Sequence, residues 1–283
     1  MHQRLRITTI VENTPGAPGL LGEHGLAFWI EAHEHRVLFD TGQGPALFPN
    51  AAKLGVDLTT AEAIVLSHGH YDHTGGLRQA LEAAPEAALY AHPDAFKPKY
   101  AVRGGVGSRA IGVPDLDEPA VRELAGEFIP VTETAEVFPG LFVTGPIART
   151  TDFESVTTSF YLDEKGTRPD NVIDDQAMYI RHAAGTIVIL GCAHAGVVNT
   201  LEAVSRLTGD RTLHAVLGGM HLSGASRERL ERTAEAFARY EMRRIAPMHC
   251  TGEKATAFFA QRFPDRFERG MAGSVFEFGD APG

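Results

Sequence analysis

The sequence predicts an α+β fold, arranged as a four-layer αββα sandwich in a single domain over residues 1–283. Three observations lead to this prediction. Short β-branched runs alternate with alanine-rich helical stretches, the second half repeats the general pattern of the first, and no linker or low-complexity tract separates the halves. Hydrophobic residues make up 43% of the chain, which is enough apolar material for a substantial core without disulfides.

In the first half, strand-like runs precede a dense polar segment. The β-branched run at 5–11 predicts a strand, and a turn-rich stretch separates it from a hairpin formed by 25–31 and 36–40. We expect a helix at 46–54 and then an apolar strand at 63–66. The remaining expected elements are a helix at 76–84, a strand at 88–91 and a long irregular loop, rich in glycine and proline, at 97–119.

The second half contains a clear hairpin followed by alternating helices and strands. The two strands of the hairpin are expected at 177–182 and 186–191, joined by Ala183, Ala184 and Gly185. The other expected elements are strands at 141–144, 215–219, 244–248 and 275–278, helices at 195–207, 227–240 and 254–263, and a polar loop at 153–174.

Charge and composition narrow the classes of partner. The net charge of −10 disfavours broad nucleic-acid binding, because an acidic surface repels phosphate backbones. Residues 1–10 lack the apolar region of a signal peptide, and no apolar run approaches the length that crosses a bilayer. The two cysteines each lie close to a histidine, which fits a reduced compartment better than a disulfide. We therefore expect a cytoplasmic protein with a small-molecule substrate and neither nucleic-acid nor membrane partners, and leave a homo-oligomer open.

The segment from Ser67 to Gly76 carries the densest set of metal-binding side chains. It reads S-H-G-H-Y-D-H-T-G-G and follows a strand that the sequence predicts to be buried. Imidazole and carboxylate groups are ligands for zinc, iron and manganese. Because alternate residues of an extended chain point the same way, His68 and His70 can share one ion, and the following turn lets Asp72 and His73 converge on a second.

Three histidines of the second half occupy equivalent places. His194, His221 and His249 each follow an apolar strand, which places them at the same edge of a sheet, where ligands can converge.

These motifs resemble a known family. The segment His68 to His73 matches the H-x-H-x-D-H signature of the metallo-β-lactamase superfamily, and Leu38 to Gly42 resembles the strand and turn beneath its metal site. Four further segments resemble the branch labelled 7,8-dihydropterin-6-methyl-4-(β-D-ribofuranosyl)-aminobenzene-5′-phosphate synthase-like: Asp175-Gln176-Ala177, Gly191-Cys192-Ala193-His194-Ala195-Gly196, Gly219-Met220-His221-Leu222 and His249-Cys250-Thr251-Gly252.

The resemblance implies a dinuclear metal centre. We assign two divalent transition-metal ions, zinc before iron or manganese, to His68, His70, Asp72, His73, His194, His249 and Asp175. Well-studied relatives usually have a histidine before the second-half hairpin and a bridging aspartate after it. Here Asp175, or Asp174, precedes the hairpin and Cys192 and His194 follow it. Asp175, Cys192 and His221 therefore each remain open as a ligand or as a partner that orients a ligand.

The function that follows is a hydrolase acting through a metal-bound hydroxide on a small phosphorylated, ester or lactone-type substrate. Asp72 is expected to orient the water or take its proton, and His221 to donate to the developing oxyanion. The alternatives are a synthase of the kind the branch label implies and a non-catalytic metal-bearing protein that binds a ligand. For the synthase, the residues expected to meet a phosphate are Lys97, Lys99, Arg103 and Arg109, and the expected ring-stacking residues are Phe153, Phe160 and Tyr161.

Overall fold

The first of two large sheets contains both ends of the described chain. The computed structural model describes residues 5–103, 107–154 and 159–279. Strands β1 to β3 and the terminal strand β16 pair antiparallel, whereas β3, β4, β5 and β8 run parallel. In spatial order this seven-stranded sheet consists of β16 (Val275–Phe278), β1 (Leu5–Val11), β2 (Ala27–Ala32), β3 (His35–Phe39), β4 (Ala63–Val65), β5 (Ala88–Ala91) and β8 (Glu127–Pro130).

The second sheet has six strands and is also mixed. Strands β13, β14 and β15 run parallel, and β12, β10 and β9 continue the sheet antiparallel. In spatial order the strands are β15 (Arg244–Met248), β14 (Leu213–Gly219), β13 (Thr186–Leu190), β12 (Ala177–Ile180), β10 (Leu141–Val143) and β9 (Ala135–Phe138). The predicted hairpin is confirmed as β12 and β13, and Gly185 turns it with a φ of 115° that favours glycine.

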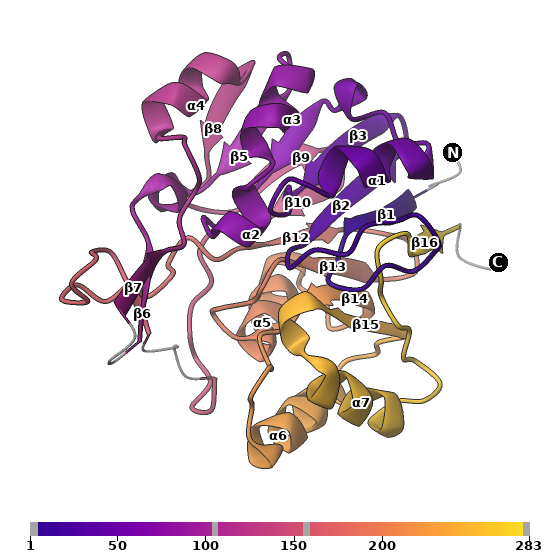
Figure 1. The fold of residues 1–283 in the computed structure, drawn as a ribbon. Coiled ribbons are helices and arrows are strands. Elements are labelled where there is room, and N and C mark those ends of the chain that lie inside the picture. Colours follow the sequence, from indigo (N-terminus) through magenta and orange to yellow (C-terminus); the bar gives the residue numbers. More distant parts are fainter. Residues whose placement is uncertain (1–4, 104–106, 155–158, 280–283) are drawn as a thin grey trace.

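The sheets face one another and helices cover both outer faces (Figure 1). A core that includes Ile7, Phe28, Met178 and Leu217 fills the space between the sheets. The helices on the outer face of the first sheet are α1 (Leu47–Leu54), α3 (Leu77–Ala83) and α4 (Glu118–Leu124), and those on the second are α5 (Val197–Thr208), α6 (Arg227–Phe237) and α7 (Glu253–Arg262). The predicted four-layer αββα sandwich is confirmed, while its behaviour as one domain stays a prediction.

Short elements complete the chain, and some of them lie where the sequence predicted loops. The short helix α2 (Tyr71–Thr74) follows β4, and single 3-10 turns span Leu58–Thr60, Pro93–Phe96 and His249–Thr251. A third, three-stranded sheet consists of β11 (Phe160–Tyr161), β6 (Tyr100–Arg103) and β7 (Gly107–Ala110), within the predicted loops 97–119 and 153–174. The prediction of irregular structure there was wrong, because β7 is exposed along its length and lacks apolar alternation.

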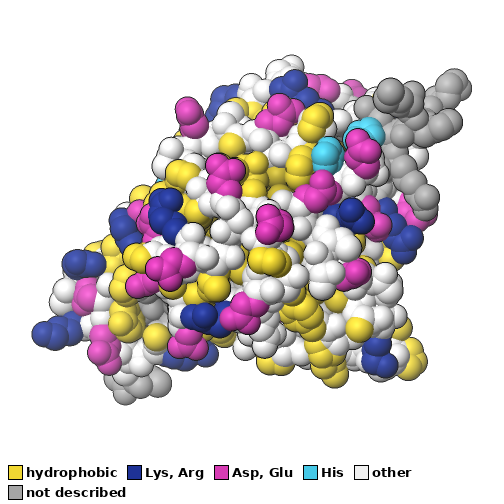
Figure 2. All heavy atoms as spheres, turned by 90° about the horizontal axis from the view of Figure 1, so that it is seen from above, with side chains coloured by type: hydrophobic (Ala, Val, Ile, Leu, Met, Phe, Trp, Pro, Cys, Tyr) yellow, Lys and Arg dark blue, Asp and Glu magenta, His cyan; other side chains and the backbone are white. Residues whose placement is uncertain are grey.

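Local signals explain where several helices begin and end. Helix α6 begins after Ser226, whose hydroxyl accepts a hydrogen bond from the backbone of Arg229. Helices α1 and α5 end at Gly55 and Gly209, both in left-handed backbone. Within the described ranges, no helix is long and apolar enough to cross a membrane. On the face shown in Figure 2, basic and acidic side chains are interspersed rather than gathered by sign.

Candidate metal centre

The predicted metal-binding segment lies where β4 ends and α2 begins. His70 is in extended backbone immediately before α2, and Asp72 and His73 are in its first turn. His68 and these three side chains are buried, which is unusual for so many ionisable groups in a short segment. Burial without partners would be costly, so the geometry around each side chain decides what the cluster does.

The three histidines of the second half are brought to the same place. His194 follows β13, His221 follows β14 and His249 follows β15, and these strands are parallel neighbours. Their carboxyl ends therefore meet at one edge of the sheet. The sequence-based expectation that these histidines converge agrees with the structure.

His68, His70 and His194 form a nitrogen cluster. The Nε2 atom of His68 lies 3.0 Å from Nδ1 of His70 and 3.2 Å from Nε2 of His194. Burial lowers the pKa of His68 and His194 well below the usual value, and burial together with the charge of Lys99 lowers that of His70 to about 4. These rings are neutral at pH 7, which is the form that binds metals.

Asp72 is the centre of a second cluster. Its Oδ2 atom lies 3.3 Å from Nε2 of His249, 3.2 Å from Nε2 of His24 and 3.9 Å from Nε2 of His73. Burial would raise the pKa of Asp72, but its close contacts with His24 and His249 hold it well below the usual range. His24 was missed by the sequence analysis, because a single histidine in a turn-rich segment gives no signal.

Cys192 lies between the two clusters. Its Sγ atom is 3.1 Å from Nε2 of His73. It forms one group of closely spaced ligand atoms with His68 and His194, and another with His73 and His249. The sulfur is thus the donor that both clusters share, and the structure favours Cys192 among the residues that the sequence left open.

Asp175 belongs to no such group within the described residues, and its assignment as a metal ligand stays a prediction. Its Oδ2 atom instead accepts a hydrogen bond of 2.8 Å from the backbone of Ala195. Burial raises the pKa of Asp175 to about 7, even though the backbone of Ala195 and His194 opposes that shift. The carboxyl group therefore fixes the loop that carries His194.

The side chain of the neighbouring Asp174 contacts the backbone of the metal-binding segment in the first half of the chain. Its Oδ2 atom accepts a 2.8 Å hydrogen bond from the N–H of Gly69, between His68 and His70. Its Oδ1 atom accepts a 2.8 Å hydrogen bond from Nζ of Lys99, which also donates to Asp170 at 2.9 Å. Lys99 is only 2% exposed, so the phosphate role that the sequence suggested for it is not supported by its position.

Further buried groups orient the histidines. Asp40 accepts hydrogen bonds from both the backbone and the hydroxyl of Ser67, and its Oδ2 lies 2.7 Å from Nδ1 of His73. Burial opposes protonation of His73, but the charge and hydrogen bond of Asp40 raise its pKa to about 9. The hydroxyl of Ser67 also lies 2.9 Å from Nδ1 of His68. Such partners fix ring orientation and tautomer in metal sites.

His249 is held by residues from the other end of the chain. Its backbone N–H donates to Glu12 at 2.8 Å, and its Nδ1 lies 2.9 Å from Oδ1 of Asn13. Its Nε2 atom, which faces Asp72, makes no hydrogen bond and is fully buried. The same is true of Nε2 of His70. Buried imidazole nitrogens without hydrogen bonds, beside a carboxylate and a thiol, fit a metal ion of the kind the sequence implies.

Comparisons with known proteins agree with this geometry. Residues 21–151 match the model of the metallo-β-lactamase superfamily. A 7,8-dihydropterin-6-methyl-4-(β-D-ribofuranosyl)-aminobenzene-5′-phosphate synthase of Methanocaldococcus jannaschii is 32% identical, over 97% of each chain. The chain belongs to the metallo-β-lactamase superfamily. An uncharacterized protein of the same archaeon is also 32% identical, over 95% of this chain and 98% of the relative.

A solved structure supports the same assignment. The crystal structure described as a metal-dependent hydrolase of the β-lactamase superfamily is 30% identical, with a TM-score of 0.83 over 98% of this chain and all of the other. The resemblance to the metallo-β-lactamase superfamily is thus confirmed, and metal dependence is a property of the superfamily.

In this member of the metallo-β-lactamase superfamily, several residues with strained backbone lie at or near the groups of closely spaced ligand atoms, which we call the donor groups. Among the described residues, seven other than glycine have positive φ, and four of them are Asp40, Ala193, His221 and His249. Such backbone is costly outside glycine and is found where the surrounding structure enforces it. Each of the four lies close after a strand, where the chain turns to present a side chain to the centre.

His221 lies beside the nitrogen cluster rather than within it. Its ring centroid is 4.3 Å from that of His194, and its backbone N–H donates to Sγ of Cys250 at 3.3 Å. Burial lowers the pKa of His221, but the hydrogen bond and charge of Cys250 outweigh burial and raise it overall. His221 also forms a donor group with Cys192 and Cys250.

The three-stranded sheet extends from one side of the sandwich (Figure 1). The ring of Phe160, on β11, lies 4.9 Å from that of His70 and 5.6 Å from that of His194. On β7, Arg109 stacks over the ring of Tyr71 at 4.9 Å and donates to its hydroxyl at 3.1 Å. An aromatic ring and an exposed guanidinium therefore flank the metal-binding segment.

The other sequence-predicted substrate residues have different surroundings. Nζ of Lys97 forms an ion pair of 2.7 Å with Asp94, and Phe153 lies beneath the guanidinium of Arg232. The side chain of Arg103 lies outside the described part of the chain, and Tyr161 neighbours Phe160 on β11. Arg109 and Phe160 both contact residues of the metal-binding segment.

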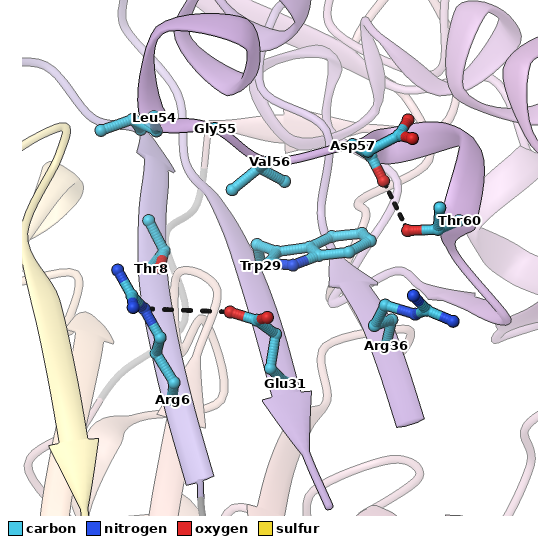
Figure 3. Close-up of a pocket in the computed structure, with 10 residues that line it drawn as sticks. All are labelled: Arg6, Thr8, Trp29, Glu31, Arg36, Leu54, Gly55, Val56, Asp57 and Thr60. Carbon is cyan, nitrogen blue, oxygen red and sulfur yellow. Dashed lines mark hydrogen bonds and ion pairs between the residues drawn. The ribbon is translucent and has the colours of Figure 1, made fainter. Parts of the chain in front are cut away.

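A separate cavity of about 310 Å³ opens on the helix-covered face of the first sheet (Figure 3). In this view Trp29 lies in the middle of the lining residues, with Val56 above its indole ring. Arg6 and Glu31 pair across it at 3.8 Å. None of the described residues that line this cavity belongs to the donor groups, so it is distinct from the candidate metal centre.

Proposed function

We propose that this chain is a dinuclear metal-dependent hydrolase of small phosphorylated, ester or lactone-type substrates. The observation that carries the proposal is the pair of buried donor groups that share the sulfur of Cys192. The 30% identical structure described as a metal-dependent hydrolase supports it further. Neutral imidazole, carboxylate and thiolate ligands favour zinc.

The donor set divides naturally between two ions. His68, His70 and His194 would hold one, and Asp72, His73 and His249 the other, with Cys192 shared between them. Ions bound there would polarise an oxygen of the substrate and acidify a water molecule.

Two side chains are suited to handle protons. Asp72 is a carboxylate at neutral pH because its pKa is held well below the usual range, so it can accept a hydrogen bond from the attacking water and orient it. The raised pKa of His221 favours its protonated form, which can donate to an oxyanion or a leaving group.

Arg109 and Phe160 indicate what the substrate carries. The guanidinium of Arg109 can pair with a phosphate or carboxylate, and stacking on Tyr71 holds it beside the metal-binding segment. Phe160 presents an apolar surface beside His70 and His194, where it can contact a ring and exclude water. Both features suit a substrate with an anionic group and an apolar or flat part.

The same features support a second candidate, a synthase that joins a pterin to an aminobenzene ribosyl phosphate. The M. jannaschii relative carries that name and matches nearly the whole chain. The compound that its name describes has a phosphate and flat rings, which Arg109 and Phe160 would meet. The two candidates differ in the second reactant, which is water for the hydrolase and an aromatic compound for the synthase.

Metal analysis and turnover test these proposals together. We expect purified protein to contain about two transition-metal ions per chain and to hydrolyse bis-p-nitrophenyl phosphate. Asp72→Ala should reduce that rate by about a hundredfold or more. The matched control is Asp152→Asn, an exposed carboxylate paired with Arg232.

The outcomes separate the candidates. Folded protein that binds no metal would contradict both. Stoichiometric metal without hydrolysis of a broad ester panel, combined with tight pterin binding, would favour the synthase. Binding of ligands without any turnover would favour a protein that only binds them.

A further inference from the structure

The fold brings the two cysteines of the chain together. Cys192 and Cys250 are 58 residues apart and follow β13 and β15, with β14 between those strands. Their sulfur atoms lie within 4.8 Å of one another, and Sγ of Cys250 donates to the carbonyl oxygen of Cys192 at 3.5 Å. Both thiols are free.

Gly219, at the end of β14, makes this approach possible. A Cβ atom on Gly219 would lie 2.7 Å from Sγ of Cys250 and 3.4 Å from Cα of Cys192. Any side chain there would occupy the space in which the two cysteines meet. The absence of a side chain at this position therefore keeps the thiols adjacent.

The two sulfur atoms have different surroundings. Cys192 is buried and faces His73 at 3.1 Å, inside the donor groups. Cys250 is half-buried and accepts a hydrogen bond from the backbone of His221. If the sulfur of Cys192 were bonded to Cys250, it could no longer bind a metal ion as a thiolate. Disulfide formation and metal binding by Cys192 therefore compete.

We propose that Cys192 and Cys250 form an oxidisable dithiol, in which a peroxide creates an intrachain disulfide and so removes a metal ligand. The sulfur of Cys250, the more exposed of the two residues, attacks the O–O bond, becomes a sulfenic acid and releases one water molecule. The sulfur of Cys192 then attacks it, the S–S bond forms and a second water molecule leaves. The two thiols supply the two electrons and two protons that reduce the peroxide.

This modification is reversible and does not depend on the reaction that the centre catalyses. A small dithiol restores both cysteines by disulfide exchange. The proposal rests on Cys192 serving the metal groups, whether the enzyme is a hydrolase or a synthase. Its tests therefore use thiols, mass and metal content rather than turnover.

The primary test uses the full-length wild-type protein, metal-loaded and chelator-treated. Each preparation is exposed to hydrogen peroxide, and its thiols are titrated after denaturation. In the chelated protein we expect the titre to fall from two thiols per chain to none, with an intact mass lower by two hydrogen atoms. A peptide map should link Cys192 to Cys250, and dithiothreitol should restore both thiols. In the loaded protein, oxidation should be slower and should release metal to a chromophoric chelator.

The variant Cys250→Ser is the matched control. It keeps Cys192, so peroxide should leave its metal content unchanged while the wild type loses metal. Two thiols that persist in the chelated wild-type protein would overturn the proposal, as would a mass that rises by oxygen atoms or a disulfide between chains. Full retention of metal after the intrachain disulfide forms would overturn the loss of a ligand. The wild-type measurements decide the question even if the variant fails to fold.

Discussion

Replacing Lys99 with methionine tests whether the buried ion pair fixes the metal-binding segment. The ammonium group of Lys99 lies between Asp170 and Asp174, and Asp174 in turn holds the backbone of Gly69. Methionine has a similar length and no charge, so the substitution removes the cation and leaves two buried carboxylates. The side chain of Lys99 is 1% exposed, and those of Asp170 and Asp174 are 5% and 0% exposed.

The expected loss is large because the remaining charges are buried. Removing one partner of a buried ion pair costs about 3–5 kcal/mol, since the other partner stays desolvated and unpaired. Lys97→Met is the matched control, because Lys97 pairs with Asp94 on the surface and its side chain is 53% exposed. Exposed pairs contribute about 0–1 kcal/mol. We therefore expect Lys99→Met to lower the free energy of unfolding by several times more than Lys97→Met.

The pH dependence gives the variant a distinct signature. In the wild type, Lys99 and its hydrogen bond overcome burial and lower the pKa of Asp174, so this stabilisation is lost as the pH falls below the ordinary value of 3.8. Burial lowers the pKa of Lys99, but Asp174 and Asp170 outweigh burial and raise it overall. The stabilisation that Lys99 contributes is therefore lost only as the pH rises above the ordinary value of 10.5. In Lys99→Met, burial raises the pKa of Asp174, and its protonation relieves the repulsion between the two buried carboxyl groups as the pH falls.

Urea denaturation from pH 7 down to pH 4, on metal-free protein, measures these differences. The stability deficit of Lys99→Met relative to wild type should shrink steadily with acidification, whereas that of Lys97→Met should stay small. Equal deficits for the two variants at pH 7 would refute the reasoning. So would a deficit for Lys99→Met that does not change with pH.

Three further substitutions probe the centre from different sides. Asp40→Asn removes the carboxylate that holds Nδ1 of His73 and orients its ring. Metal affinity, measured by chelator competition, should fall about 10–100-fold. Phe160→Ala removes the ring beside the nitrogen cluster; metal content should be unchanged while KM rises, and a parallel loss of metal would contradict its assignment to the substrate. Gly69→Ala places a Cβ 1.9 Å from the carbonyl oxygen of Ala95, so the metal-binding segment must shift. Metal affinity and thermal stability should both fall. A variant with unchanged affinity and stability would show that the loop is freer to move than the geometry implies.

The sequence predicted the parts of the centre that follow repeating patterns. The H-x-H-x-D-H segment is contiguous, and His194 and His249 follow strands whose apolar character is plain. Parallel strands end at one edge of a sheet, so strand prediction alone indicates that these residues meet. The four layers follow from the same alternation of strands and helices.

The sequence could not predict which of Asp175 and Cys192 faces the histidines of the candidate metal centre. These residues flank β12 and β13, and the pairing of Ala177 with Leu190 brings both to the same end of the hairpin. Local spacing therefore could not distinguish them. Their side chains point in different directions: the carboxylate of Asp175 faces the backbone of Ala195, whereas the sulfur of Cys192 faces His73.

Other contributors lie far apart along the chain. Asn13 contacts His249 across 236 residues, and His24 reaches Asp72 from the segment before β2. No local periodicity encodes such contacts. The exposed strand β7 was missed for a related reason: it packs against no large apolar face, so its sequence lacks the alternation that marks a half-buried strand.

The two donor clusters draw on both large sheets, which has a consequence for how the molecule opens. His68 and His73 follow β4 of one sheet, and His194 and His249 follow β13 and β15 of the other. Each bound ion would thus cross-link the two faces of the sandwich at one edge. Free metal at a thousand times the dissociation constant would add about 4 kcal/mol to the free energy needed to separate the two faces. Amide hydrogen exchange should accordingly slow in β2 and β14 alike, although neither strand leads into a residue assigned to the two ions.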